Sequence, residues 1–293
     1  MNKPITASMI FPALVVLTIA LWASAFVGIR YAVESYHPGS LALLRYLIAS
    51  VCMIFIWKKN PGPSVIRKQD ILPLLLTGIL GIALYNITLN HAEISISAGE
   101  ASFMVAQTPV LNAVLAVLFL GELSRKQLWI GLVISAIGVM LIARSNLHQF
   151  SINDGFWFIL IATLCSGVYT IIQKPLVSRI QPIRCACLAI WIGTIVLLIY
   201  TPELIHDVQY ASLKATLSVV YLGVFPAAIA YALWSHLLSK LSATKTSMTL
   251  YLSPIFTLIL AWLFLRETPA ALAILGGVIA LIGAFITNRR PRG

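Results

Sequence analysis

Two charged side chains of this 293-residue chain lie inside long apolar runs. Arg45 is about five residues into the run 40–57, or about 8 Å deep in a helix that rises about 1.5 Å per residue. Glu100 enters the run 97–120 to a similar depth. Such charges are costly in lipid and mark either an ion pair or a wet cavity. Two interpretations therefore stand: Arg45 pairs with Glu100, or Arg45 receives a substrate carboxylate.

Polar and aromatic side chains accompany these charges. Glu100, Phe103 and Gln107 recur at helical spacing, so they share one helix face. The other candidates for a binding site are Trp22, Phe26, Tyr85, Asn86, Asn90, Tyr169, Tyr231, Trp234 and Tyr251. Small-molecule pockets are mostly apolar with a few placed polar groups, so we expect this set to line a central cavity. The alternative is that the amides join neighbouring helices and the aromatic rings only pack.

The composition is that of a membrane protein. Apolar residues make up 60% of the chain and charged residues 10%, against about 45–50% and about 25% in soluble domains. This excludes an ordinary soluble enzyme, a disordered chain and a fibrous repeat. The four cysteines lie in or beside apolar runs and are interpreted as packing residues. Since the chain contains no ATP-binding loop, zinc-protease motif or other catalytic signature, we expect no enzyme activity, cofactor or metal.

Ten apolar runs predict an all-α integral membrane protein with ten spanning helices. Most runs exceed the roughly 9–11 residues of a membrane strand, and a helix pairs its own backbone groups in lipid. With both termini in the cytoplasm, 15 of the 20 Lys and Arg residues lie inside and four outside, as the positive-inside rule requires. Membrane topology then explains the net charge of +11, which does not indicate nucleic-acid binding. The runs are 10–30, 40–57, 71–90, 97–120, 127–143, 155–173, 182–200, 213–238, 246–265 and 270–287.

An internal repeat divides the chain into residues 1–147 and 148–293. At an offset of about 145 residues, Pro109 aligns with Pro254, Gly131 with Gly276, and Gly138 with Gly283. Each half holds five predicted helices, and five is an odd number, so the second half enters the membrane from the opposite side. Inverted repeats of this kind typically build transporters with a site between the halves near the bilayer midplane.

Prolines and glycines at matched positions predict local irregularity. Pro109 and Pro254 each remove a backbone hydrogen bond and favour a kink. The third and eighth predicted helices should be loosened by Gly78 and Gly81, and by Gly223 and Pro226. We expect these two helices, and the fourth and ninth helices that contain the matched prolines, to bend during function. The matched glycines of the fifth and tenth helices should let those two helices approach closely.

Several motifs resemble the EamA-type group of the drug/metabolite transporter superfamily. They are Leu21-Trp22-Ala23-Ser24-Ala25-Phe26, Leu44-Arg45-Tyr46, and Pro109 followed by Phe119-Leu120-Gly121-Glu122, Gly131 and Gly138. The resemblance covers nearly the whole chain. It implies ten helices in two inverted five-helix units, a central cavity, and transport of small metabolites, often efflux of amino acids. The second half departs from the pattern, since Ala189 stands where Arg45 would repeat.

These observations favour a secondary transporter of the inner (plasma) membrane that exports amino acids or related metabolites. The alternatives are a carrier of nucleotide-linked or lipid-linked sugars, a membrane enzyme, and a receptor or scaffold. For proton coupling, Glu100, His91 and His236 are the candidates, and a facilitator or exchanger is an equal alternative. The expected partners are a small-molecule substrate and membrane lipid, with no nucleic acid; a homodimer is left open.

Overall fold

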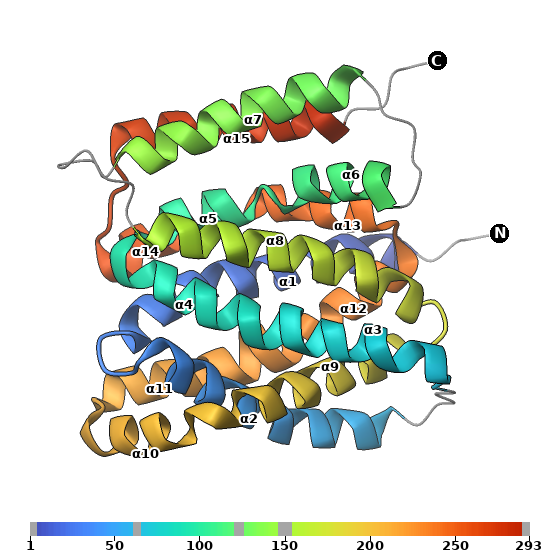
Figure 1. The fold of residues 1–293 in the computed structure, drawn as a ribbon, viewed down its shortest axis with the longest axis vertical. Coiled ribbons are helices and arrows are strands. Elements are labelled where there is room, and N and C mark those ends of the chain that lie inside the picture. Colours follow the sequence, from blue (N-terminus) through green and yellow to red (C-terminus); the bar gives the residue numbers. More distant parts are fainter. Residues whose placement is uncertain (1–4, 61–65, 120–125, 146–153, 289–293) are drawn as a thin grey trace.

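The computed structural model describes residues 5–60, 66–119, 126–145 and 154–288, and every regular element among them is a helix (Figure 1). Seven helical segments are long and apolar enough to cross a membrane, and two shorter apolar helices accompany them. This agrees with the predicted all-α membrane protein. The fourth predicted run, 97–120, is divided into two shorter helices, so ten spans remain a prediction.

Five of the predicted runs coincide with single unbroken helices. These are α1 (Ile5–Ala32), α2 (Pro38–Lys59), α7 (Lys126–Ser145), α8 (Asp154–Leu176) and α15 (Ala271–Asn288). The run 182–200 forms α9 (Pro182–Leu197) and the short η2 (Leu198–Tyr200). It then continues into α10 (Thr201–Tyr210), which the sequence analysis did not anticipate.

Two helices contain a π-helical turn at the predicted weak points. The first series is α3 (Lys68–Gly78), η1 (Ile79–Leu84) and α4 (Tyr85–Ser95). The second is α11 (Leu213–Leu222), η3 (Gly223–Ile229) and α12 (Ala230–Lys240). Such turns occur frequently at functional sites. Gly81 lies inside η1, and Gly223 and Pro226 lie inside η3, as the sequence predicts.

The two proline sites break their helices instead of kinking them. The chain forms α5 (Ala98–Val105) and α6 (Thr108–Phe119), with the break just before Pro109. It forms α13 (Ala243–Met248), η4 (Thr249–Leu252) and α14 (Ser253–Leu265), with the 3₁₀ turn just before Pro254. Proline has no backbone N–H to donate, and its ring clashes with the carbonyl four residues earlier, which explains why the regular helix ends about one turn before each ring. Matched irregularities in the two halves support the predicted repeat.

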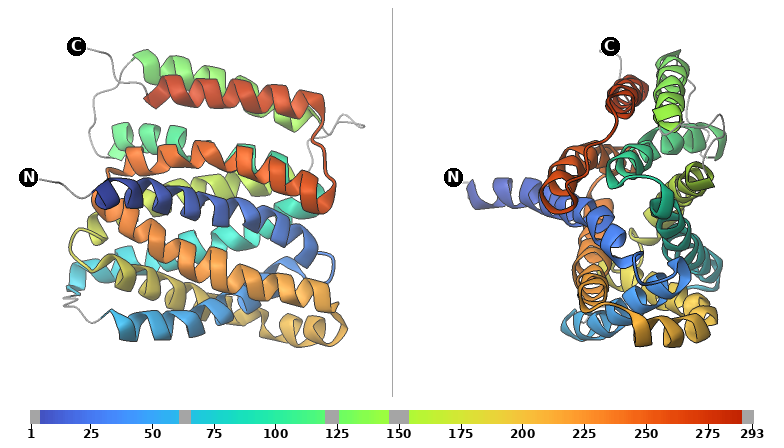
Figure 2. Two further views of the ribbon diagram at one scale, coloured as in Figure 1. Left: turned by 180° about the vertical axis from the view of Figure 1, so that it is seen from behind. Right: turned by 90° about the vertical axis from the view of Figure 1, so that its left-hand side faces the viewer.

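The direction of the helices also supports an inverted repeat. In Figure 1, α1 begins at the right-hand end of the bundle, whereas α8, the first helix of the second half, begins at the left-hand end. The start of α1 and the end of α15 lie at the same, right-hand end of the bundle, and Figure 2 shows the same arrangement from behind. The helices α1 and α8 therefore run in opposite senses along the bundle axis.

Helices α7 and α15 form a closely packed pair at one edge of the bundle (Figure 2). A methyl group placed on Gly138 would lie 2.4 Å from the Ala280 amide nitrogen and 2.5 Å from the Gly276 carbonyl oxygen. A methyl group on Gly131 would lie 2.4 Å from the Gly283 carbonyl oxygen. The predicted close approach is confirmed, and it depends on the absence of side chains at these positions.

One carboxylate fastens α10 to the turn between α1 and α2. The buried Asp207 accepts a hydrogen bond of 2.9 Å from the His37 backbone N–H and another from the Ser40 hydroxyl. The His37 ring Nδ1 lies 2.9 Å from the same carboxylate, and this hydrogen bond raises the pKa of His37. Amphipathic α10 is thus held against the start of α2 at the left-hand end in Figure 1.

Candidate functional site

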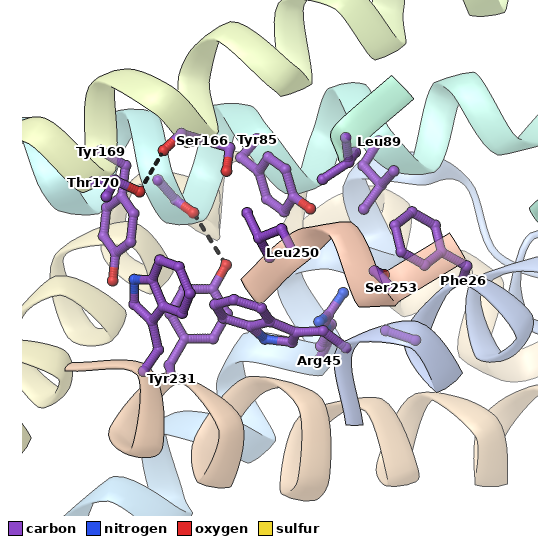
Figure 3. Close-up of a pocket in the computed structure, with 15 residues that line it drawn as sticks. Phe26, Arg45, Tyr85, Leu89, Ser166, Tyr169, Thr170, Tyr231, Leu250 and Ser253 are labelled. Carbon is purple, nitrogen blue, oxygen red and sulfur yellow. Dashed lines mark hydrogen bonds between the residues drawn. The ribbon is translucent and has the colours of Figure 1, made fainter. Parts of the chain in front are cut away.

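A central pocket lies between α1, α4, α8, α12 and the break before α14 (Figure 3). Its empty volume is about 640 Å³, including the part that is open to solvent. Both halves of the chain contribute to the wall, as a transport cavity between two repeats requires. The lining residues are Trp22, Ala25, Phe26, Arg45, Gly81, Tyr85, Leu89, Val105, Ser166, Tyr169, Thr170, Tyr231, Trp234, Leu250 and Ser253.

Aromatic rings from α1, α8 and α12 form one side of this pocket. The Trp22 ring centroid lies 4.9 Å from that of Trp234 and 5.4 Å from that of Tyr231. The Tyr231 ring in turn meets Tyr169 edge-on at 6.1 Å. Rings in these orientations stabilise one another and present a large, rigid apolar surface to a ligand.

The two π-helical segments supply backbone acceptors for these rings. The Trp22 indole N–H donates to the Pro226 carbonyl of η3 at 3.1 Å. The Tyr231 hydroxyl donates to the Gly81 carbonyl of η1 at 3.3 Å. A methyl group on Gly81 would lie 2.1 Å from the Tyr169 ring, so only glycine permits this ring to pack against η1. The irregular backbone therefore positions the aromatic wall.

Arg45 is the charged residue in the pocket wall. Its side chain is buried, and its Nη1 donates to the Asn86 amide oxygen at 2.9 Å. Asn86 uses its own amide group to donate to the Tyr46 hydroxyl and to the Ile82 carbonyl, both at 2.8 Å. These bonds fix the rotamer of Asn86, which in turn orients the guanidinium.

The structure gives Arg45 and Glu100 different hydrogen-bond partners. A Glu100 carboxylate oxygen accepts from the backbone N–H and the hydroxyl of Ser97, each at 3.0 Å, and so caps the start of α5. Ser97 and Glu100 form the reciprocal capping box that is typical of helix starts. The expected Arg45–Glu100 ion pair is absent from the ion pairs between described residues.

Three hydrogen-bond donors in the pocket wall are buried without a protein partner. They are the Arg45 Nε–H, the Tyr169 hydroxyl and the Trp234 indole N–H. Buried polar atoms are nearly always paired, so unpaired donors that line one pocket need an explanation. A ligand carboxylate would satisfy the Arg45 Nε–H in a charge-assisted pair, whereas Tyr169 lies on the opposite side of the pocket from Arg45 (Figure 3). Figure 3 shows Arg45 and the Tyr residues around the same cavity.

Seven of the thirteen predicted site residues line the pocket, and Asn86 lies directly behind Arg45. The other five have structural contacts elsewhere. Asn90 donates to the Pro38 carbonyl at 3.0 Å, and Tyr251 donates to the Ala284 carbonyl at 3.0 Å. Gln107 donates to the Phe103 carbonyl at 3.1 Å, and it accepts from the Ser135 hydroxyl. Phe103 packs in the core against Gly277.

The sequence analysis missed several lining residues. Ser166 precedes Tyr169 by three residues on α8 and Thr170 follows Ser166 by four, so helical spacing from Tyr169 to Ser166, and from Ser166 to Thr170, could have identified them. Leu250 and Ser253 enter the pocket because the chain leaves the α-helix at η4. The spacing of a regular helix would not have predicted that these two residues line the pocket.

The model of the EamA-like transporter family matches residues 10–144 and again residues 153–289. A relative from Streptantibioticus cattleyicolor, named "Probable terminal-alkyne amino-acid exporter", is 35% identical over 95% of this chain and 93% of its own length. The "Uncharacterized transporter YdfC" of Bacillus subtilis is 37% identical over 92% of this chain and 88% of its own length. A solved crystal structure matches with a TM-score of 0.66 at 15% identity and 94% coverage of both chains, which shows a shared fold.

Proposed function

Because the chain belongs to the EamA-like transporter family, we propose that it exports amino acids or closely related metabolites by alternating access. It is an integral membrane protein, and the family and its relatives point to transport and not to catalysis. Residues 1–147 and 148–293 form the two inverted halves, which cross the inner membrane ten times in total. Both termini face the cytoplasm, in keeping with the distribution of Lys and Arg.

The main support for this proposal is the Arg45 guanidinium, which lies in the wall of an aromatic pocket and has an Nε–H without a partner. Arg45 has a fixed orientation and a spare Nε–H donor, so it is prepared to receive a carboxylate. The rings of Trp22, Tyr231 and Trp234 offer apolar surface to the rest of the molecule. The relative named for amino-acid export supports this substrate class.

A sugar nucleotide is a poorer substrate for the same pocket. Its diphosphate would need several cations, and Arg45 is the one Lys or Arg among the lining residues of the described pocket. The amino-acid class therefore fits the charge of this wall better.

Counterflow in liposomes tests the proposal. Purified protein is reconstituted in vesicles that contain a high concentration of one unlabelled metabolite, and uptake of the same labelled metabolite is followed. We expect transient accumulation with apolar or aromatic amino acids and none with their decarboxylated amines, because the amines lack the group that Arg45 binds. Equal counterflow of acid and amine would contradict the assignment of Arg45, and no counterflow with any metabolite would contradict transport.

A further inference from the structure

The helix faces that line the pocket continue beyond it toward the left-hand end of the bundle in Figure 1. On α4, Leu89 lines the pocket and Glu93 follows at the i+4 position of the same face. On α1, Phe26 lines the pocket and Arg30 follows in the same way. Arg30 and Glu267 also line a second hollow at this end, which lies against the turn between α4 and α5. Glu93 therefore lies on α4 between Leu89, which lines the central pocket, and Ile94, which lines that hollow.

Glu93 is fully buried, and neither of its carboxyl oxygens has a hydrogen-bond partner. An ionised carboxylate without a partner is strongly disfavoured in such a place, so the group holds a proton in this conformation. The capping and bracing contacts already described do not use this carboxyl. A buried acid that serves no structural bond is unusual and calls for a functional explanation.

Arg30 contacts Glu93, but its guanidinium forms an ion pair with a different carboxylate. Its Nη1 donates to the Glu93 backbone carbonyl, and its Nε donates to the Glu267 carboxylate at 2.9 Å. The second oxygen of Glu267 accepts from the Ala98 backbone N–H at 3.2 Å. We name Arg30, Glu93, Ala98 and Glu267 the Arg30 cluster. It joins α1, α4, α5 and the end of α14.

Each of the other titratable groups around Glu93 has contacts of its own or is exposed. Arg45 on α2 is bonded to Asn86, and Glu100 on α5 caps its own helix. On α4 itself, the His91 ring stacks on Phe158 of α8, and Tyr85 lines the pocket. Asp154, at the start of α8, is exposed. Among these groups, Arg30 is the cation next to Glu93 that could exchange one carboxylate partner for another.

We propose that Glu93 is a proton-binding site that couples proton entry to substrate export. The inference rests on the transport function proposed above. When the Arg30 cluster is closed, Arg30 pairs with Glu267 and Glu93 is neutral. Loss of the Glu93 proton to the cytoplasm leaves a carboxylate that draws Arg30 away from Glu267, and this end then opens. Rebinding of a proton from outside releases Arg30 to Glu267 and closes this end. The proton later leaves along the Leu89 and Tyr85 face into the pocket, when the pocket opens to the cytoplasm.

Infrared spectroscopy of the purified protein tests the proton site without any substrate. We expect the carbonyl absorption of a buried protonated carboxyl at neutral pH. It should disappear in Glu93→Gln and persist in Glu34→Gln, a matched control at an exposed carboxylate in the turn after α1. Because Gln is a neutral isostere of the protonated acid, Glu93→Gln should fold in normal yield. An absorption that survives in Glu93→Gln, or is missing from the unchanged protein, would overturn the site.

Flux measurements test the coupling. In the vesicles described above, a pH gradient should accelerate substrate movement through the unchanged protein and through Glu34→Gln. Glu93→Gln should exchange substrate for substrate with a rate ratio of one with and without the gradient. If the unchanged protein shows counterflow but ignores the gradient, coupling is wrong and the transport function stands. If no metabolite shows counterflow, the transport function fails, and the infrared result alone decides whether Glu93 binds a proton.

Discussion

Arg45→Lys is expected to weaken substrate binding by about tenfold to a hundredfold, which corresponds to about 1.4–2.8 kcal/mol. Lysine keeps the positive charge but loses the planar fork of donors that pairs with a carboxylate in two places. It also loses the geometry of the bond to Asn86, so the remaining ammonium is not held in place. Binding of an amino acid to the detergent-purified variant, measured by calorimetry, would give this ratio directly.

Arg184→Lys is the matched control for this change. The Arg184 guanidinium lies 4.3 Å from the Trp57 ring centroid and does not line the pocket. It should bind substrate as the unchanged protein does. If Arg45→Lys kept full affinity but gave a reduced folded yield, Arg45 would be a structural residue and not the carboxylate receptor.

Gly138→Val should sharply lower the folded yield and the thermal stability of the protein. The new side chain would meet the Ala280 nitrogen and the Gly276 oxygen, and both atoms belong to the backbone of α15 and cannot rotate aside. Overpacking of this kind typically costs about 1–3 kcal/mol, and more where backbones must separate. Thermal unfolding in detergent, followed by fluorescence-detected size exclusion, would show the loss.

Ala136→Val provides the comparison on the same helix. Ala136 faces outward from α7, so the larger side chain meets no protein backbone. It should unfold near the temperature of the unchanged protein. Equal stability of the two valine variants would mean that α7 and α15 do not depend on their close contact.

Hydrophobic runs predicted the helices well because lipid demands that each spanning segment pair its own backbone groups. Matched prolines and glycines also predicted where the helices would be irregular. The type of irregularity was not predictable: η1 and η3 are π-helical, whereas a short turn interrupts the helix before Pro109. Helix α10 was missed because it is amphipathic and short, so it gives no spanning signal.

The candidate site was harder to predict because depth in a helix does not reveal which way a side chain points. Gln107 has the depth of a pocket residue, but the break after α5 turns it toward α7, where it bonds Ser135. Glu100 has the depth of a buried charge, but its place three residues after Ser97 makes it a cap. Glu93 was passed over because it lies just beyond the run 71–90, where acids usually face water, and only tertiary packing buries it.

Accessibility of the pocket from both sides of the membrane tests the central claim most directly. Ser166 lines the pocket and is half-buried, so Ser166→Cys, in a chain whose own cysteines are replaced, is a suitable reporter. Ser178→Cys and Ser212→Cys serve as one-sided controls, because these exposed residues follow α8 and α10 at opposite ends of the bundle.

A membrane-impermeant thiol reagent is added to the outside of cells and, separately, to inverted vesicles. We expect each control to react from a single side and Ser166→Cys to react from both sides, with substrate protecting it in each case. If Ser166→Cys reacts from one side only, with and without substrate, the pocket does not alternate between the two faces and the transport account is wrong.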